Sequence, residues 1–411
     1  MSQYAEIADI VHARCTGERD DEEWVLEDPR VQWAIENGDW MAWIVAVAMS
    51  VCASLGMPER FSRMNRRGAP DTWKIGALVL TAFLDKSEGG GMKELSGMTR
   101  VLALGGLTAA PDESTLRKFC DRLPESLLDD IIAETFRACG GMDHTIAIDG
   151  TGFSDSNASP HYCKRILQMK EEKPAEEDSV DDGKSPEITY GCTQVRGFEK
   201  ATLAGSTSTL VICICDVVSD HSADVRRMLP VARAMADYHI KPDAILADKG
   251  YDAEHVHKEL RQLLECDVII PARESEPAKL SRPNEPCTRG FFRRIMRTAW
   301  GSFADRYRDR ALIECINSML KRLFGGRVSS RREDLRHMEV KLACIGHNIL
   351  RMADLRAVRR PMRAQFRGSG CRVRSCHRGR IHFRPPPPLK FKYLPDLVAI
   401  GNAHGRHEEG A

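Results

Sequence analysis

The stretch AILADKGYD, residues 244–252, joins a short apolar run to a tip that holds an aspartate, a lysine and a glycine. The run Ala244–Ala247 is typical of a buried strand, and the segment after it, Ala253–Glu265, repeats its apolar residues with a helical period. One interpretation of the tip is a turn, which Gly250 favours. The other interpretation is that the strand presents the carboxylate of Asp248 to a ligand.

Other segments indicate an α/β sheet around this strand. Short apolar runs at Thr145–Ile148, Thr209–Val218 and Val268–Pro271 are predicted as further strands. Helical stretches lie between them, near Asp224–Tyr238 and at Ala253–Glu265. Strands that alternate with helices predict an α/β core.

Residues 1–140 are predicted to form a mostly helical N-terminal domain. Helices are expected at Asp71–Lys86, at Met92–Leu104, from Pro111 onward and at Leu127–Cys139, with a glycine-rich break at 88–91 between the first two. The segment Trp40–Met57 has no charge and is at the lower length limit for a membrane span. Its large apolar residues fall on one helical face, which favours a helix packed inside the domain and no contact with a membrane.

Charge is unevenly distributed along the 411 residues, although the net charge is only +1. Residues 1–40 hold 11 acidic and 3 basic side chains, whereas residues 289–380 hold 24 Lys and Arg against 7 Asp and Glu. This local excess favours nucleic acid as the partner, and a solvated basic surface is the alternative. The acidic insertion 170–187 is predicted to be solvated, and the basic, Pro- and Gly-rich tail 361–411 to be partly disordered.

The 14 cysteines are scattered, without the dense spacing of a disulfide framework. This pattern is typical of a reduced intracellular protein, so we expect a cytoplasmic location. Cys371, Cys376 and His377 suggest zinc, but the sequence lacks a second matching pair of ligands.

Two aspartates follow predicted strands in the same way. Asp149 comes directly after Thr145–Ile148, and Asp248 directly after Ala244–Ala247. Ligand sites of open α/β sheets lie beyond the strand ends, where converging carboxylates need a cation, and Mg²⁺ prefers such ligands. Asp155 is an alternative first carboxylate, although its neighbours indicate a loop. His221 and Asp224 are an alternative metal pair, which we interpret as residues that position the strand end.

The segment YRDRALIECINSMLK, residues 307–321, is predicted to be an amphipathic helix. At about 100° per residue, one face holds Tyr307, Arg310, Glu314 and Lys321. The opposite face, expected to enter the core, holds Leu312, Ile316, Met319, Leu320 and Leu323. An exposed i,i+4 ion pair between Arg310 and Glu314 is the simplest explanation of the polar face. The two aspartates favour instead a third carboxylate ligand at Glu314.

These segments together resemble the DDE transposases of the IS4/IS5 type. AIDGTGF, residues 147–153, and ILADKGYD, residues 245–252, are similar to the strands that carry the family's two aspartates. The spacing Tyr307-x2-Arg310-x3-Glu314-x6-Lys321 matches the Y-R-E-K signature of IS5-like members at every position. Weaker similarity is found in PDESTLRKF (111–119), SDHSADVRRMLP (219–230) and HNILR (347–351), so the resemblance covers about residues 70–355.

The resemblance implies a ribonuclease-H-like catalytic domain over residues 141–360, preceded by the helical domain 1–140, which we expect to help bind DNA ends. Asp149, Asp248 and Glu314 would hold two Mg²⁺ ions, with Mn²⁺ as a substitute, for cleavage and transfer of DNA strands. The partners implied are the terminal inverted repeats of an insertion sequence and target DNA, bound by a homodimer at the nucleoid. The residues expected to contact DNA phosphates are Tyr307, Arg310, Lys321 and Lys249.

The basic stretch 289–380 adds two arginine clusters near Glu314, one at 293–297 and one that contains Arg331, Arg332 and Arg336. We expect Arg331 and Arg332 to bind the DNA backbone. Ion pairs with Glu333, Asp334 and Glu339 on a helix surface are the alternative. Two other functions fit the same residues, namely a metal-dependent nuclease of the same fold and a transposon-derived DNA-binding protein without catalysis.

Overall fold

The computed structural model describes residues 3–16, 24–61, 68–84, 88–140, 145–155, 198–219, 223–271 and 300–355. Several features singled out in the sequence lie outside these residues. They are the acidic insertion 170–187, His221, the arginine cluster 293–297, and the tail 361–411 with Cys371, Cys376 and His377.

The described strands form one mixed sheet of six, in the order β3-β2-β1-β4-β5, with β6 paired to β1. The strands are β1 Thr145–Asp155, β2 Phe198–Ser206, β3 Ile212–Val218, β4 Ala244–Ala247, β5 Asp267–Ile269 and β6 Arg327–Val328. The pairs β1–β2 and β2–β3 are antiparallel, whereas β4 and β6 are parallel to β1 and β5 is parallel to β4. The prediction of a mixed helical and α/β protein is therefore confirmed.

The strand predictions succeed where apolar residues are continuous and fail elsewhere. β4 has the predicted bounds. β1 runs on past Ile148 to Asp155, so Asp149 lies in the middle of a long strand and does not follow its end. β2 was not predicted, and β3 begins at Ile212 rather than Thr209 because residues 207–210 form the turn between the two strands.

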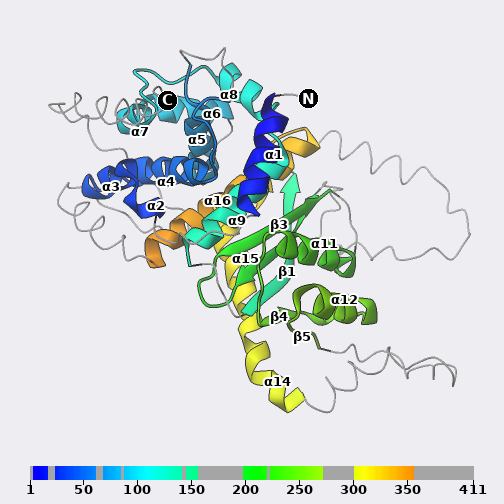
Figure 1. Ribbon diagram of the computed structural model, residues 1–411. Helices are drawn as coiled ribbons and strands as arrows, with labels where there is room; N and C mark the ends of the chain where they lie inside the picture. The colour runs from blue at the N-terminus through cyan, green and yellow to red at the C-terminus, as the bar shows by residue number, and fades with distance from the viewer. Residues whose placement is uncertain are drawn as a thin grey trace, which may run out of the picture.

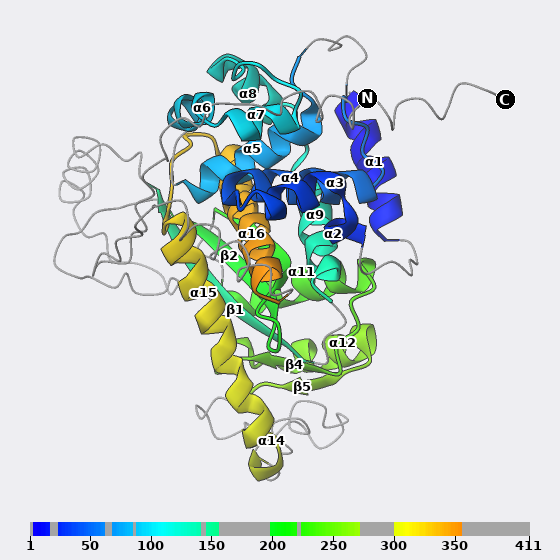
Figure 2. The ribbon, with the colours of Figure 1, turned by 90° about the vertical axis from the view of Figure 1, so that its left-hand side faces the viewer.

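Helices cover both faces of the sheet (Figure 1). α11 Asp224–Asp237 and α12 Glu254–Leu264 lie on one side, and α9 Glu125–Ala138, α15 Ala311–Phe324 and α16 Glu333–Leu355 lie on the other. Figure 2 shows α14 Trp300–Tyr307 and α15 as one long rod along the sheet, joined by the 3₁₀ turn Arg308–Arg310. α15 contacts β1 and β2, which brings its side chains to the middle of the sheet.

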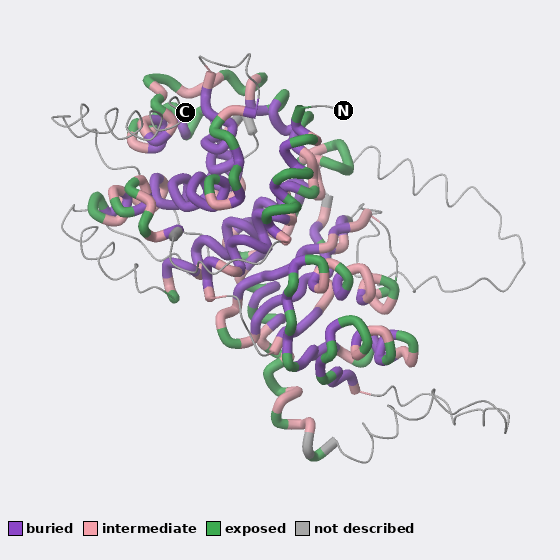
Figure 3. The backbone as a smooth tube through the Cα atoms, in the orientation of Figure 1, coloured by how far each residue is buried: buried purple, intermediate pink, exposed green. Residues whose placement is uncertain are grey.

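The N-terminal region is helical, as predicted, and packs on α16 through α4 and α5. α4 and α16 are buried along most of their length (Figure 3). The helices of this region are α1 Gln3–Cys15, α2 Trp24–Glu27, α3 Pro29–Glu36, α4 Trp40–Ser54, α5 Asp71–Phe83, α6 Glu88–Ser96, α7 Thr99–Leu104 and α8 Glu113–Cys120. No helix in the described ranges has both the length and the apolar character needed to cross a membrane.

The glycine-rich segment 88–91 is not the predicted break but the first turn of α6. A Cβ atom on Gly91 would lie 2.2 Å from the Thr81 side chain on α5, so the glycine allows the two helices to approach closely. The predicted helix Met92–Leu104 is correspondingly two helices, α6 and α7, separated at residues 97–98.

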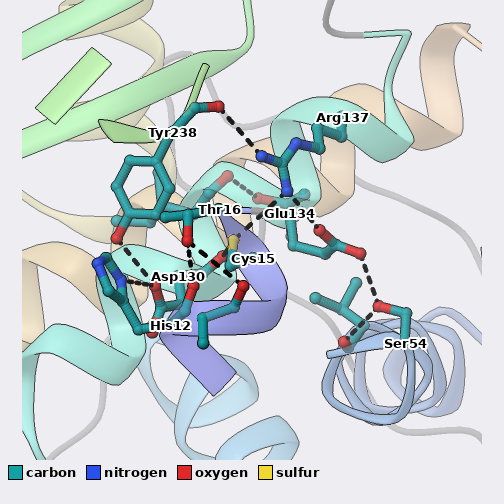
Figure 4. A network of polar contacts seen from close by, with 12 residues as sticks. His12, Cys15, Thr16, Ser54, Asp130, Glu134, Arg137 and Tyr238 are labelled. Carbon is teal, nitrogen blue, oxygen red and sulfur yellow. Dashed lines mark hydrogen bonds and ion pairs between the residues drawn. The ribbon is translucent and has the colours of Figure 1, made fainter. Parts of the chain in front are cut away.

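A polar network centred on the buried Asp130 joins the N-terminal helices to the sheet region (Figure 4). Asp130 on α9 accepts a hydrogen bond from the Tyr238 hydroxyl at 2.9 Å and is 2.8 Å from Nδ1 of His12 on α1. Arg137 on α9 donates to Glu134 and to the backbone carbonyl of Tyr238, at 3.2 and 3.1 Å. Tyr238 directly follows α11, so this network ties α1 and α9 to the far side of the sheet.

The HNILR segment of α16 fixes the turn between β2 and β3. The Asn348 side chain accepts the Ile212 N–H at 2.8 Å and donates to the Ile212 carbonyl at 2.7 Å, as a neighbouring strand would. His347 Nε2 is 2.9 Å from the Leu210 carbonyl oxygen, and the Arg351 guanidinium donates to the Thr209 carbonyl. These contacts hold β3, and through it β2, in register beside β1.

Candidate active site

The parallel register of β1 and β4 brings Asp149 and Asp248 together. Ile148 pairs with Ala247, and each of these residues is followed directly by one of the two aspartates. Asp248 lies just past the end of β4, where its Oδ1 accepts the N–H of Gly250 at 2.5 Å and begins a 3₁₀ turn, Lys249–Tyr251. Tyr251 is buried behind this turn. The two carboxylates therefore sit side by side on adjacent strands.

Glu314 reaches the same place from α15. The helix lies close to β2 because residue 205 is a glycine: a Cβ atom there would be 2.6 Å from Ile316 Cδ1 and 3.3 Å from Ile313 Cδ1. Ile313 and Ile316 are fully buried in this contact. Glu314, on the polar side of the same helical turn, remains 58% exposed.

Arg310 contacts all three carboxylates. Its Nη1 is 2.5 Å from Glu314 Oε1, and its Nη2 is 3.5 Å from Asp149 Oδ1 and 3.9 Å from Asp248 Oδ2. The Arg310 side chain is 19% exposed. The i,i+4 pair expected from the sequence is thus present, but the guanidinium also bridges the two strands. Three carboxylates around one guanidinium leave a net negative charge at this point.

Asn317 is a member of the site that the sequence did not predict. Its Nδ2 donates to Asp149 Oδ2 at 3.1 Å, and its own Oδ1 is buried without a hydrogen-bond partner. Asn317 follows Glu314 by three residues and therefore lies on the same side of the helix, which is the one signal that could have indicated it.

The buried face of α15 also differs from the prediction. Ile316 and Leu320 are buried as expected, but Leu312, Met319 and Leu323 are only half-buried. The other buried residues are Ile313, Asn317 and Phe324. The helix is turned so that Asn317 reaches Asp149, and apolar periodicity cannot predict a buried amide.

Burial controls the electrostatics of the site. It raises the pKa of Asp149, with Asp248 and Glu314 adding to the rise and the Arg310 charge opposing it. Burial also lowers the pKa of Lys321, which Asp149 opposes, and raises the pKa of Tyr307. Lys321 Nζ lies 5.7 Å from the centroid of the Phe153 ring on β1. The charge of Asp149 thus acts on Lys321, and the charges of all three carboxylates act on Tyr307.

The alternative carboxylates raised by the sequence, Asp224 and Asp155, are placed differently from Asp149 and Asp248. Asp224 Oδ1 pairs with Lys200 Nζ at 2.5 Å and lies next to Gly150, one residue beyond Asp149. Its charge is therefore already matched by a lysine, and its partner His221 is outside the described residues. Asp155 is the last residue of β1 rather than part of a loop.

The candidate DNA-binding residues outside this helix differ in whether they are already engaged in ion pairs within the protein. Lys249 and Arg331 are exposed. Arg332 forms ion pairs with Asp121 at 2.5 Å and with Asp334, and Arg336 pairs with Glu199. Glu339 accepts hydrogen bonds from Ser329 and Ser330 rather than from an arginine. The alternative of surface ion pairs is thus present for Arg332 with Asp334, whereas Arg331 makes no ion pair with any described residue.

The donor set suits a hard divalent cation, because three carboxylates offer only oxygen ligands. Within the described part of the chain, no three acidic, histidine or cysteine side chains are arranged to hold a metal ion. At Asp149, Asp248 and Glu314, the Arg310 guanidinium lies among the carboxylate oxygens.

Comparison with known proteins places this site inside a recognised domain. Residues 141–349 match the family model described as "Transposase DDE domain", which spans β1 to α16 and all three carboxylates. No curated protein and no solved structure matches the chain.

Proposed function

Because the chain belongs to the DDE transposases, we propose that it is the IS5-like transposase of an insertion sequence. It would bind the terminal inverted repeats of its element, cleave the DNA there and join the freed strands to target DNA. The observation that carries the proposal is the convergence of Asp149, Asp248 and Glu314, from two strands and a helix, on the single Arg310 side chain. The strand order and directions fit the ribonuclease-H-like core expected for such an enzyme.

In this proposal Asp149, Asp248 and Glu314 hold two Mg²⁺ ions, for which Mn²⁺ is a substitute. Metal ions held there would stabilise the attacking and the leaving oxygen of an in-line displacement at phosphorus. Asn317 keeps the Asp149 carboxylate oriented through its 3.1 Å hydrogen bond. No side chain has to form a covalent bond with DNA, because water and then the freed 3′-hydroxyl are the nucleophiles.

The polar face of α14 and α15 would receive the DNA backbone. Tyr307, Arg310 and Lys321 line this face beside the carboxylates, and Lys249 projects from the adjoining turn. Phosphate oxygens accept hydrogen bonds from such groups and fix the position of the duplex without reading its sequence. Arg331 and Arg332 would contact further phosphates of the DNA backbone. The exposed Arg117 and Lys118 of α8 are candidates for binding transposon ends in the N-terminal region.

The experiment uses a plasmid that carries the gene with its own flanking DNA, incubated with the purified full chain, Mg²⁺ and a second target plasmid. Cleavage at the element ends and joined products are both measured on gels. Asp149→Asn, Asp248→Asn and Glu314→Gln should each reduce cleavage at least about tenfold, a barrier increase of about 1.4 kcal/mol or more. Binding of the flanking DNA should persist in all three variants.

Asp267→Asn is the matched control, because Asp267 is an exposed carboxylate paired with Arg306 at 2.8 Å, outside the carboxylate site. This variant should cleave like the wild type. Cleavage without joined products would favour a metal-dependent nuclease. Sequence-specific binding without any cleavage would favour a transposon-derived DNA-binding protein.

A further inference from the structure

Arg310 occupies the position where the carboxylates of the proposed site converge. Its two terminal nitrogens contact one oxygen each of Glu314, Asp149 and Asp248, at 2.5, 3.5 and 3.9 Å. We infer that Arg310 is an internal cation that holds the carboxylate cluster in the DNA-free protein. It must transfer to a DNA phosphate before divalent cations bind there with full affinity. This inference rests on the proposed function of the same three carboxylates.

Competition follows from the atoms involved. The guanidinium and a divalent cation would use the same carboxylate oxygens, and two cations at one cluster repel each other. A unit charge at about 4 Å in an effective dielectric constant of about 20 is enough to change a binding constant more than tenfold. Arg310 in its present position therefore lowers the affinity of the cluster for Mg²⁺.

The hydrogen-bonding groups of the Arg310 guanidinium are also poorly satisfied in this position. Its Nε is buried without a hydrogen-bond partner, and two of its three contacts with carboxylates are longer than 3.2 Å. A phosphate offers a planar guanidinium two short, charge-assisted hydrogen bonds, which is a better arrangement. The residue belongs to the 3₁₀ turn between α14 and α15, so its long side chain can change partner without moving the core of α15.

The two aspartates keep other hydrogen-bond partners when Arg310 leaves. Asp149 keeps its hydrogen bond from Asn317, and Asp248 keeps the one from the Gly250 N–H. Both donors are neutral, so they orient the oxygens without competing for the position of the cation. Asp149 and Asp248 thus keep their orientation while the internal charge of Arg310 is exchanged for external cations.

A coupling between DNA and metal follows, because a phosphate that removes Arg310 raises the Mg²⁺ affinity, and Mg²⁺ raises the DNA affinity by the same factor. The free protein would therefore hold little metal, and the metal ions would bind with full affinity only after a DNA phosphate has taken up Arg310.

The test is calorimetric titration of the full chain with Mg²⁺ in the absence of DNA. Arg310→Gln should bind Mg²⁺ about tenfold more tightly than the wild type, which is about 1.4 kcal/mol. Arg310→Lys, which retains the charge on a side chain with one donor group, should fall between them. Circular dichroism checks that each variant is folded.

Two controls separate occupancy of the site from a general loss of positive charge. Lys321→Gln removes a cation within electrostatic range of Asp149. Arg306→Gln removes an arginine that pairs with Asp267 away from the cluster. Neither change should raise the Mg²⁺ affinity more than about twofold. Equal tightening in Lys321→Gln and Arg310→Gln, or unchanged binding in Arg310→Gln, would overturn the inference.

A second titration includes a short duplex of arbitrary sequence at fixed ionic strength. DNA should increase the Mg²⁺ affinity of the wild type several-fold and that of Arg310→Gln much less, and an equal increase in both would also overturn the inference. Asp149→Asn distinguishes this failure from a failure of the proposed function. Mg²⁺ binding that is unaffected by Asp149→Asn would show that the carboxylates are not the metal site at all.

Discussion

Replacement of Asn348 by alanine should cost a large part of the stability of the protein. Asn348 is fully buried on α16, and its amide makes three hydrogen bonds. It accepts the Ile212 N–H at 2.8 Å and donates to the Ile212 carbonyl at 2.7 Å and to the Thr135 hydroxyl at 2.9 Å. In Asn348→Ala these groups remain buried and lose their partner.

The magnitude follows from those unsatisfied groups. A buried donor or acceptor left without a partner costs about 1–3 kcal/mol. The two backbone groups of Ile212 are the important ones, because the Thr135 hydroxyl also donates to the Ile132 carbonyl. We therefore expect the free energy of unfolding to fall by about 3–5 kcal/mol, a large fraction of the roughly 5–15 kcal/mol typical of a folded protein.

Urea unfolding followed by circular dichroism measures this loss. Asn37→Ala is the matched control, because Asn37 is exposed and its amide makes one hydrogen bond, to the Trp33 carbonyl at 2.8 Å. It should cost less than about 1 kcal/mol, as exposed substitutions usually do. A loss below about 1 kcal/mol in Asn348→Ala, with an unchanged urea dependence, would refute the argument that this side chain replaces a neighbouring strand.

Three further predictions concern α16, α15 and the basic surface. Burial lowers the pKa of His347 to about 4, whereas an unfolded histidine protonates near pH 6.5. Unfolding therefore takes up a proton between these values, so the free energy of unfolding should fall by up to roughly 3 kcal/mol as the pH drops from about 6.5 to about 4. Urea unfolding of His347→Gln should show a flatter pH profile there. Gly205→Ala should lower the free energy of unfolding by about 1–3 kcal/mol because its Cβ would overlap Ile316. Gly301→Ala, with nothing within 4 Å of the new Cβ, should be neutral or stabilising in the same assay. Arg331→Ala should make the slope of log K against log salt shallower by about 0.9 in DNA-binding titrations. Arg332→Ala should change it less, since that guanidinium is engaged by Asp121 and Asp334.

The sequence predicted the parts of the fold in which local pattern and tertiary environment agree. β4 and α11 were found within one residue because an apolar run and an amphipathic period marked them. β2 was missed because FEKATLAGS has few large apolar residues and draws its stability from pairing with β1 and β3 on both sides. Long-range pairing of this kind leaves no local signal.

The candidate site likewise combines features that have a local sequence signal with features that depend on tertiary packing. The convergence of the three carboxylates could be predicted, because two directly follow apolar residues that pair on adjacent strands and the third has a family spacing. Asn317 and the bridging position of Arg310 could not, since each depends on the angle at which α15 crosses β1 and β2. Gly205 sets how closely that helix approaches, and its sequence neighbours do not reveal that a helix lies above it.

The pairing of β1 with β2 extends to Ser154 opposite Phe198, close to the ends of segment 156–197. Two residues opposite each other in an antiparallel ladder are about 5 Å apart, so the sheet itself closes this connection. The entropic cost of a loop rises only by about 0.6 kcal/mol for each doubling of its length. The junction is therefore a permissive point for insertion, where segment 156–197 could be exchanged for a tag or a sensor domain while Asp149 keeps its position.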